Sequence, residues 1–262
     1  MSFQPVLPLT GYAGWAFLKR TLAEQQTHFT ATAAMKRDAD YFASKIGTVD
    51  TAEDLVSDRR LLKVALGAYG LDADIDNRAF IRKVLSDGTL DRSDLANRLS
   101  DKAYYTMAAD FGFDLGTPST KLSDFADRTL DLYGQRQFEA AVGEQNNSYR
   151  LALNAERMLS DLAGKPSTEN TKWFTIMGNE PLRAVFQTAL GLLPSTAKLD
   201  VDQQLSLFKA RATAVFGDAT ISQFADREKT DALVRRFILR DEIANIAPPQ
   251  SAASIALQIL RR

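Results

Sequence analysis

The sequence predicts an all-α, multihelical fold made of two pseudo-repeated helical units, each with a long helix followed by shorter helices. Three observations predict it. Residues 14–46 and 122–163 contain no proline and are rich in good helix formers. Apolar residues recur with helical spacing, and no run alternates like a strand between hairpin turns. Finally, residues 58–71 align without gaps on residues 179–192.

The first part of the chain reads as an arm followed by one helical unit. Residues 1–13, with two prolines, are expected to form an N-terminal arm, and residues 14–120 the first unit. A long amphipathic helix is predicted over 14–46. Further helix starts are expected at the capping box that begins at Thr51, then at Asp58, at Asp76 or Asn77, at Asp91 or Ser93, and near Lys102. Gly70 supplies a helix stop.

The second unit is expected over residues 121–247. Residues 122–163 form its long helical segment, although Gly134 and Gly143 weaken the prediction of one unbroken helix. Shorter helices are predicted at Thr171–Met177, Pro181–Leu190, Val201–Phe216, Ile221–Phe224 and Lys229–Ala244. Pro248 and Pro249 then separate a C-terminal tail, 248–262, in which Ser251–Arg262 could form a terminal helix.

The alignment of 58–71 on 179–192 indicates an internal duplication. Five of the fourteen aligned positions are identical, and Asp58 aligns with Asn179, which keeps the chemistry of a helix N-cap. Chance similarity between two helices rich in alanine and leucine is the alternative interpretation.

Composition excludes several classes of function. The 262 residues are 45% apolar and 25% charged, enough to build a sizeable core, and the net charge of −1 gives no signature of nucleic-acid binding. The longest nearly apolar run, Leu61–Leu71, is much shorter than the ~20 residues that cross a bilayer. Residues 1–9 lack the pattern of a secretory signal. We therefore expect no nucleic-acid partner, no membrane insertion and a cytoplasmic location.

No catalytic, metal or cofactor site is predicted. The chain has one histidine and no cysteine, so it can build neither a thiolate site nor a site that needs two imidazoles. His28 follows Glu24 by one helical turn, and an exposed helix face explains it better than acid–base chemistry. Asp72, Asp74 and Asp76 match the first ligands of a calcium loop, but Asn77 and Lys83 occupy the glycine and glutamate positions. Loops that cradle phosphates are missing.

A polar block in the second long segment supplies the candidate binding residues Gln145, Asn146 and Asn147. Asparagine is a poor residue inside a helix, because its side chain competes for backbone hydrogen bonds. These amides could bind a partner or a buried network. A solvated face or a local helix break is the alternative and is favoured.

Several long blocks resemble the domain of unknown function 1217 family (DUF1217). They include DRRLLKVALGAYGL (58–71), RQFEAAVGEQNNSYRLALNAER (136–157) and KWFTIMGNEPLRAVFQTALGL (172–192). Shorter blocks at 79–85, 96–104 and 223–240 extend the resemblance over nearly the whole chain. The resemblance implies an alphaproteobacterial source, an all-helical structure and a frequent association with flagellar gene clusters. It supplies no catalytic motif.

These observations lead to one expected function and one alternative. We expect a non-enzymatic helical interaction protein, associated with flagellar assembly or motility, whose partners are proteins, possible flagellar components among them. A helical enzyme, or a small-ligand or metal-binding protein with an unrecognised acidic site, is the alternative. The resemblance also makes a flagellum-associated location, or export without a cleavable signal, the alternative to the cytoplasm. Neither the oligomeric state nor the step of action follows from the sequence.

Overall fold

The computed structural model describes residues 3–246, which confirm the all-α prediction. They form thirteen α-helices and five short 3₁₀ helices, and no strand lies between residues 3 and 246. In that part of the chain no helix is long and apolar enough to cross a membrane. The tail at 248–262, with its expected terminal helix, lies outside the described residues.

The chain divides into two compact units, which share helix α1 (Gly11–Thr30). Unit 1 runs from Arg20 to Glu144 and includes the N-terminal residues up to Val6. Its helices are α2 (Ala33–Lys45), α3 (Ala52–Ser57), α4 (Arg59–Tyr69), α5 (Arg78–Asp87), α6 (Leu95–Arg98), α7 (Lys102–Phe111) and α8 (Phe125–Gln145), with 3₁₀ helices η1 (Ile46–Thr48), η2 (Asp72–Asp74) and η3 (Ser119–Lys121).

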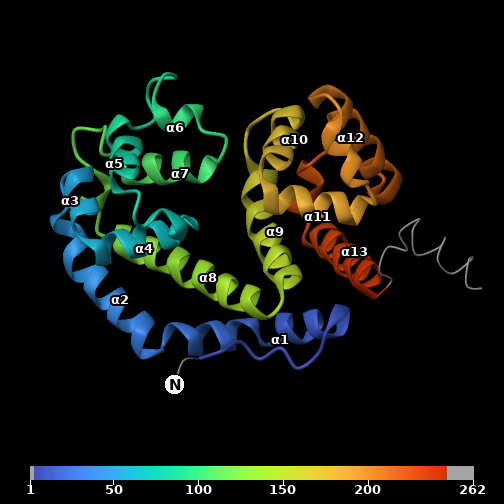
Figure 1. The fold of residues 1–262 in the computed structure, drawn as a ribbon, viewed down its shortest axis with the longest axis horizontal. Helices are drawn as coiled ribbons and strands as arrows, with labels where there is room; N and C mark the ends of the chain where they lie inside the picture. Colours follow the sequence, from blue (N-terminus) through green and yellow to red (C-terminus); the bar gives the residue numbers. More distant parts are fainter. Residues whose placement is uncertain (1–2, 247–262) are drawn as a thin grey trace, which may run out of the picture. The chain divides into compact units, whose positions relative to one another are not determined.

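Unit 2 combines Leu7–Lys19 with the chain from Gln145 onward. Its helices are α9 (Asn147–Gly164), α10 (Glu169–Gly178), α11 (Glu180–Leu190), α12 (Val201–Phe216) and α13 (Arg227–Ile246), with η4 (Pro194–Lys198) and η5 (Ser222–Ala225). Helices α9, α11 and α13 pack on one another (Figure 1). The units therefore meet in the sequence at Glu144, later than the expected boundary at 120–121, because α8 packs its apolar face into unit 1.

The single long helix predicted over 14–46 is wrong. Helix α1 ends at Thr30, and α2 begins at Ala33 after Thr32, whose backbone is extended (φ −61°, ψ 148°). Two threonine hydroxyls before the break donate to helix carbonyls: Thr27 to Ala23 O at 2.8 Å and Thr30 to Gln26 O at 3.0 Å. Such bonds compete with the helical backbone ladder.

The expected helix start at Asp91 or Ser93 is also wrong. Asp91 instead accepts the backbone N–H of Ser93 at 2.8 Å in a local turn. Helix α6 begins two residues later, at Leu95, with Asp94 as the preceding residue.

Each unit has its own apolar core. In unit 1 every helix from α2 to α8 contributes buried side chains, with Phe111 edge-on to Phe125 at 5.0 Å between ring centroids. In unit 2, Trp173 is fully buried, 5.5 Å from the Phe186 ring, and its indole N–H donates to Ala219 O at 2.8 Å. Trp15, on α1, packs beside Tyr149 in the same unit. Both tryptophans therefore belong to unit 2.

Helices α4 and α11, which carry the aligned segments, have matching ends. Each has eleven residues. Asp58 (φ −97°, ψ 104°) and Asn179 (φ −101°, ψ 109°) accept N–H groups of the first turn, and Gly70 and Gly191 end the helices in the left-handed conformation. The local geometry thus follows the alignment, while duplication of whole units stays a prediction.

Candidate functional site

The predicted polar block lies where α8 gives way to α9. Gln145 is the last residue of α8. Asn146 has extended backbone (φ −149°, ψ 101°) and accepts the Tyr149 N–H at 3.0 Å, so it is the N-cap of α9. Asn147 accepts two guanidinium N–H groups of Arg150, at 3.0 and 2.7 Å. The expected local helix break is therefore present, and binding of a partner by these amides stays a prediction.

The other polar motifs lie in separate local arrangements. His28 is exposed on α1, with its Nε2 3.8 Å from Glu24 Oε1. Asp72, Asp74 and Asp76 do not converge. They accept hydrogen bonds from Gln137 (2.7 Å), Tyr104 (2.5 Å) and Arg59 (2.6 Å) respectively. Within residues 3–246, no three histidine, aspartate or glutamate side chains are grouped so that they could hold a metal ion.

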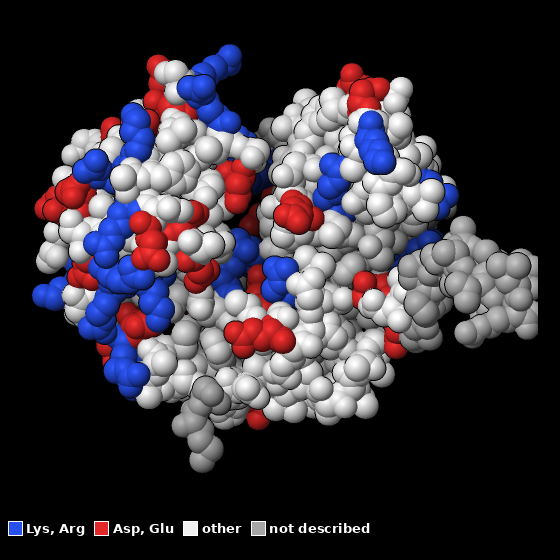
Figure 2. Space-filling view, in the orientation of Figure 1, with Lys and Arg blue, Asp and Glu red and all other residues white. Residues whose placement is uncertain are grey.

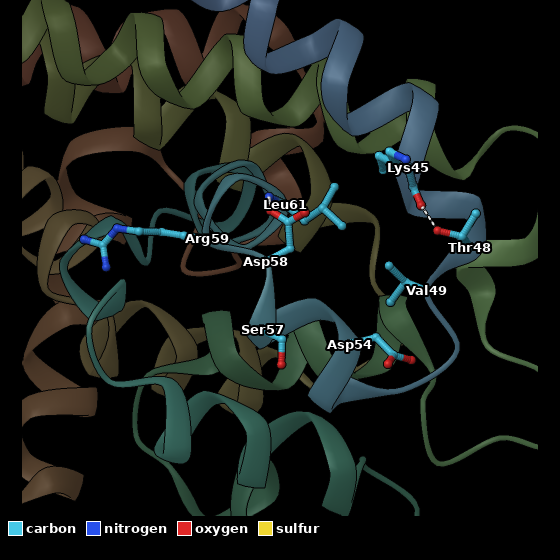
Figure 3. Close-up of a pocket in the computed structure, with 8 residues that line it drawn as sticks. All are labelled: Lys45, Thr48, Val49, Asp54, Ser57, Asp58, Arg59 and Leu61. Carbon is cyan, nitrogen blue, oxygen red and sulfur yellow. Dashed lines mark hydrogen bonds between the residues drawn. The ribbon is translucent and has the colours of Figure 1, made fainter.

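A cavity of about 580 Å³ opens in unit 1 between the end of α2, helix α3 and the start of α4 (Figure 3). Its lining residues are Lys45, Thr48, Val49, Asp54, Ser57, Asp58, Arg59 and Leu61.

The carboxylates of this cavity build helix ends. Asp54 completes the capping box of α3, and a hydrogen bond from the Thr51 hydroxyl lowers its pKa. Asp58 accepts the Arg60 and Leu61 N–H groups at the start of α4. Figure 3 shows Arg59 extending away from the other labelled side chains, and it forms an ion pair with Asp76 at 2.6 Å. This cavity therefore has the chemistry of a structural junction rather than of a catalytic site.

Four tyrosines of unit 1 donate their hydroxyl hydrogen to aspartates, an arrangement that the sequence did not reveal. The pairs are Tyr41 with Asp58 (2.5 Å), Tyr69 with Asp110 (2.9 Å), Tyr104 with Asp74 (2.5 Å) and Tyr133 with Asp38 (3.2 Å). The partners are 17 to 95 residues apart, so no local motif signals them. These pairs link elements of the unit and use carboxylates that could otherwise bind a ligand.

A second groove of unit 1, about 470 Å³, lies between α1, α2 and α8. Met35, Leu130 and small residues line it, with Asp131, Gln26 and Gln135 as polar groups. The hydroxyls of Thr27 and Tyr133, which also line the groove, already donate to Ala23 O and Asp38. The groove thus offers apolar side chains, one carboxylate and a tyrosine hydroxyl that is already engaged with Asp38.

Unit 2 contains a buried Lys–Ser–Glu cluster that could suggest a nucleophile. Lys172, only 4% exposed, donates to Ala163 O at 2.8 Å and to Ser222 Oγ at 2.7 Å, and its Nζ lies 3.5 Å from Glu169 Oε1. The three acceptors around the Lys172 ammonium match its three N–H donors, so each donor has a partner within unit 2. We interpret the cluster as a brace between α9, α10 and η5.

Unit 2 also has an exposed apolar surface on a segment whose backbone is hydrogen-bonded. We call this surface the 193–201 surface. Leu193, Leu199 and Val201 are 70%, 41% and 54% exposed. Hydrogen bonds to two backbone carbonyls hold this segment. The N–H of Thr196, which is 4% exposed, donates to Leu193 O at 3.0 Å, and the Gln204 side-chain amide donates to Leu199 O at 2.7 Å. In Figure 2, Lys and Arg are interspersed with Asp and Glu over unit 1, while charged side chains are sparse on the visible face of unit 2.

These features describe an all-helical protein whose polar side chains mostly stabilise helix ends and junctions. The family described as "Protein of unknown function (DUF1217)" matches residues 68–230, and the chain therefore belongs to this family. The crystal structure of protein AGR_C_984 from Agrobacterium tumefaciens is similar to the chain, with 26% identity and a TM-score of 0.75. The similarity covers 93% of this chain and 100% of that one. No curated protein matches the chain.

Proposed function

We propose that this chain is a non-enzymatic helical interaction protein that binds a protein partner through the 193–201 surface, in flagellar assembly or motility. The observation that carries the proposal is the exposure of Leu193, Leu199 and Val201 on a segment whose backbone is already fixed. The flagellar setting rests on the resemblance of the chain to a family often encoded among flagellar genes.

The energetics of this surface favour binding. Fully burying a leucine or valine side chain stabilises a complex by about 1.5–3 kcal/mol. A rigid segment loses little conformational entropy when a partner binds, so most of that free energy is retained. Charged residues next to the surface, such as Lys198 and Asp200, could form the polar rim that surrounds an apolar contact.

The first experiment tests the flagellar setting in the native organism. Deletion of the gene should impair swimming, and the wild-type chain supplied in trans should restore it. Normal swimming with normal filaments in the deletion strain would reject the flagellar role.

The second experiment tests the surface. In the deletion strain, Leu193→Asp together with Leu199→Asp should fail to restore swimming and should lose partners recovered by pull-down. The matched control is Leu90→Asp, since Leu90 is 76% exposed on a loop of unit 1. Equal recovery by the surface variant and the control, at equal protein level, would reject the 193–201 surface.

The groove beside Asp131 is the observation that favours the alternative, a small-ligand protein. Its apolar floor and single carboxylate suit an amphipathic cation. Thermal-shift screening with aliphatic amines tests this alternative, and Asp131→Asn should abolish any stabilisation found. Equal stabilisation of the Asn variant would place binding elsewhere.

A further inference from the structure

The start of the chain, residues 3–6, is not helical and lies along helix α1 within unit 1 (Figure 1). Burial alternates along it. Phe3 is half-buried and Pro5 is buried, while Gln4 and Val6 are exposed. This alternation is typical of an extended segment that turns one side toward the protein. We call residues 3–6 the arm segment.

Gln25 of α1 holds the main chain of the arm segment. Its side-chain oxygen accepts the Val6 N–H at 2.7 Å, and its amide nitrogen donates to Val6 O at 3.2 Å. The same nitrogen donates to Thr21 Oγ1 at 2.8 Å. Gln25 is only 6% exposed, so these bonds are largely shielded from water, whereas the Val6 side chain is 52% exposed. Gln25 therefore pairs with both backbone groups of Val6, as a neighbouring strand would, and does not depend on the side chain there.

Three phenylalanines connect the arm segment to the core of unit 1. Phe138 of α8 is fully buried, and the Phe29 ring is edge-on to it at 5.7 Å between centroids. The Phe3 ring is in turn edge-on to Phe29 at 6.0 Å. Such edge-to-face pairs stabilise a contact beyond the apolar area that they bury. The face of α1 thus makes an aromatic contact at one position of the arm segment and a main-chain contact three positions later.

We propose that Thr21, Gln25 and Phe29 form a binding site for an extended segment of a partner protein, and that the arm segment is its resident ligand. We call these three residues the arm site. The partner's segment has an aromatic residue against Phe29 and, three positions later, a residue other than proline whose backbone pairs with Gln25. A proline between the two, placed as Pro5 is, keeps the segment extended and lowers the conformational entropy lost on binding.

The tether of the arm segment explains why the occupant is a foreign segment rather than a second copy. A short tether gives an effective concentration on the order of millimolar. The arm segment of a second copy has the same sequence and makes the same contacts, so at lower concentrations it does not displace the tethered one. A segment of another protein can do so if its contacts are more favourable. The arm segment therefore sets a threshold of affinity for partners of unit 1.

A labelled synthetic peptide with the sequence of residues 3–8, FQPVLP, tests the arm site in the full chain. Phe3→Ser with Val6→Pro should release the arm segment, because the changes remove the aromatic contact and the N–H that Gln25 accepts. Fluorescence anisotropy should show that this released variant binds the peptide about tenfold more tightly than wild type, whose site is mostly filled. Gln4→Pro is the matched control, since Gln4 is exposed, and it should bind the peptide like wild type.

Two further comparisons test recognition by Gln25. The peptide FQPPLP lacks the N–H at its fourth position, so the released variant should bind it about tenfold more weakly than FQPVLP. Adding Gln25→Ala to the released variant should weaken binding of FQPVLP by a similar factor. Adding Glu24→Ala, at an exposed neighbouring position, should leave the affinity unchanged. Circular dichroism checks that each variant is folded, and Val6→Pro alone replaces the double variant if that one loses helix.

Several outcomes would overturn the proposal. Absence of peptide binding by the folded released variant would show that the contact forms only when the arm segment is tethered. Equal affinity of wild type and the released variant would place peptide binding elsewhere, and equal affinity for the two peptides would exclude main-chain recognition by Gln25. Wild-type dimers at the assay concentration, seen by light scattering and lost in the released variant, would make a second copy the occupant. All of these readouts concern unit 1, so failure here leaves the 193–201 surface to its own test.

Discussion

At the scale of single residues, Asp58 shows how the polar side chains of this protein are used. Its carboxylate accepts the N–H groups of Arg60 and Leu61 at the start of α4, and it also accepts the hydroxyl of Tyr41. One side chain therefore fixes a helix end and ties α4 to α2. The sequence predicted the cap, because Asp58 precedes an apolar helix, but it could not predict Tyr41, which lies 17 residues away.

Replacing Asp58 should destabilise the protein measurably. Asp58→Ala removes a helix cap and a partly buried hydrogen bond, and should lower the free energy of unfolding by about 1–2 kcal/mol. Asp76→Ala is the control, since its ion pair with Arg59 is exposed and should contribute less than about 0.5 kcal/mol. Urea denaturation measures both, and equal losses would contradict the role of Asp58.

The carboxylate of Asp58 should also make the free energy of unfolding depend on pH in the acidic range. Burial alone would raise the pKa of Asp58, but hydrogen bonds from Tyr41 and from the Leu61 and Arg60 amides outweigh burial and lower it. A lowered folded pKa gives stability that is present above the unfolded value and lost as pH falls through the folded one. Asp58→Asn should therefore lose less stability than wild type between about pH 5 and pH 3. Parallel losses would contradict this assignment.

At the scale of elements, N-cap residues and C-terminal glycines predicted the ends of helices better than the spacing of apolar residues did. Thr51, Asp58 and Gly70 were placed correctly because each supplies a specific backbone contact or conformation. The break after Thr30 was missed, since the apolar spacing from Trp15 to Ala33 continues across it. Threonine hydroxyls bond to helix carbonyls inside the unbroken helices α10 and α12 as well, so threonine content does not locate the break.

Replacing glycine with alanine should have opposite effects on stability at two positions near the ends of consecutive helices. Gly191 caps α11 with φ +67°, so Gly191→Ala should destabilise by about 1–2 kcal/mol. Gly178, the last residue of α10, has no neighbour within 4 Å of an added Cβ, and Gly178→Ala should stabilise by about 0.4–1 kcal/mol. Thermal unfolding compares them, and a shift of the same sign would contradict the assigned conformations.

At the scale of the whole molecule, the sequence did not predict the candidate surface. Leu192 and Leu193 are neighbours of the same type, yet Leu193 is 70% exposed and Leu192 is partly covered. Two adjacent leucines of one type give no sequence signal for which of them faces solvent. The cavity of unit 1 escaped prediction for a related reason, because α2, α3 and α4 all contribute to it.

The two units should unfold together, because α1 contributes to both cores. Trp15 packs on Tyr149 in unit 2, and Phe29 of the same helix packs on Phe138 in unit 1. Leu62→Ala, at a fully buried site of unit 1, should cost about 2–5 kcal/mol. Tryptophan fluorescence, which reports unit 2, should shift its denaturation midpoint as much as circular dichroism does. A fluorescence midpoint that does not move would show independent units.

The tyrosine–aspartate pairs have a consequence for the optical behaviour of the protein in alkali. Burial, followed by the charge and hydrogen bond of Asp110, raises the pKa of Tyr69, and burial likewise raises the pKa of Tyr133 beside Asp38. A raised folded pKa gives stability that is present below about pH 10 and lost as the phenols ionise at higher pH. Phenolate absorbance from these tyrosines should therefore rise together with the loss of circular dichroism. Phenolate formation that precedes unfolding would contradict the pairing. Unit 1 has no tryptophan, and the ultraviolet absorbance of its tyrosines thus offers an optical signal for its unfolding.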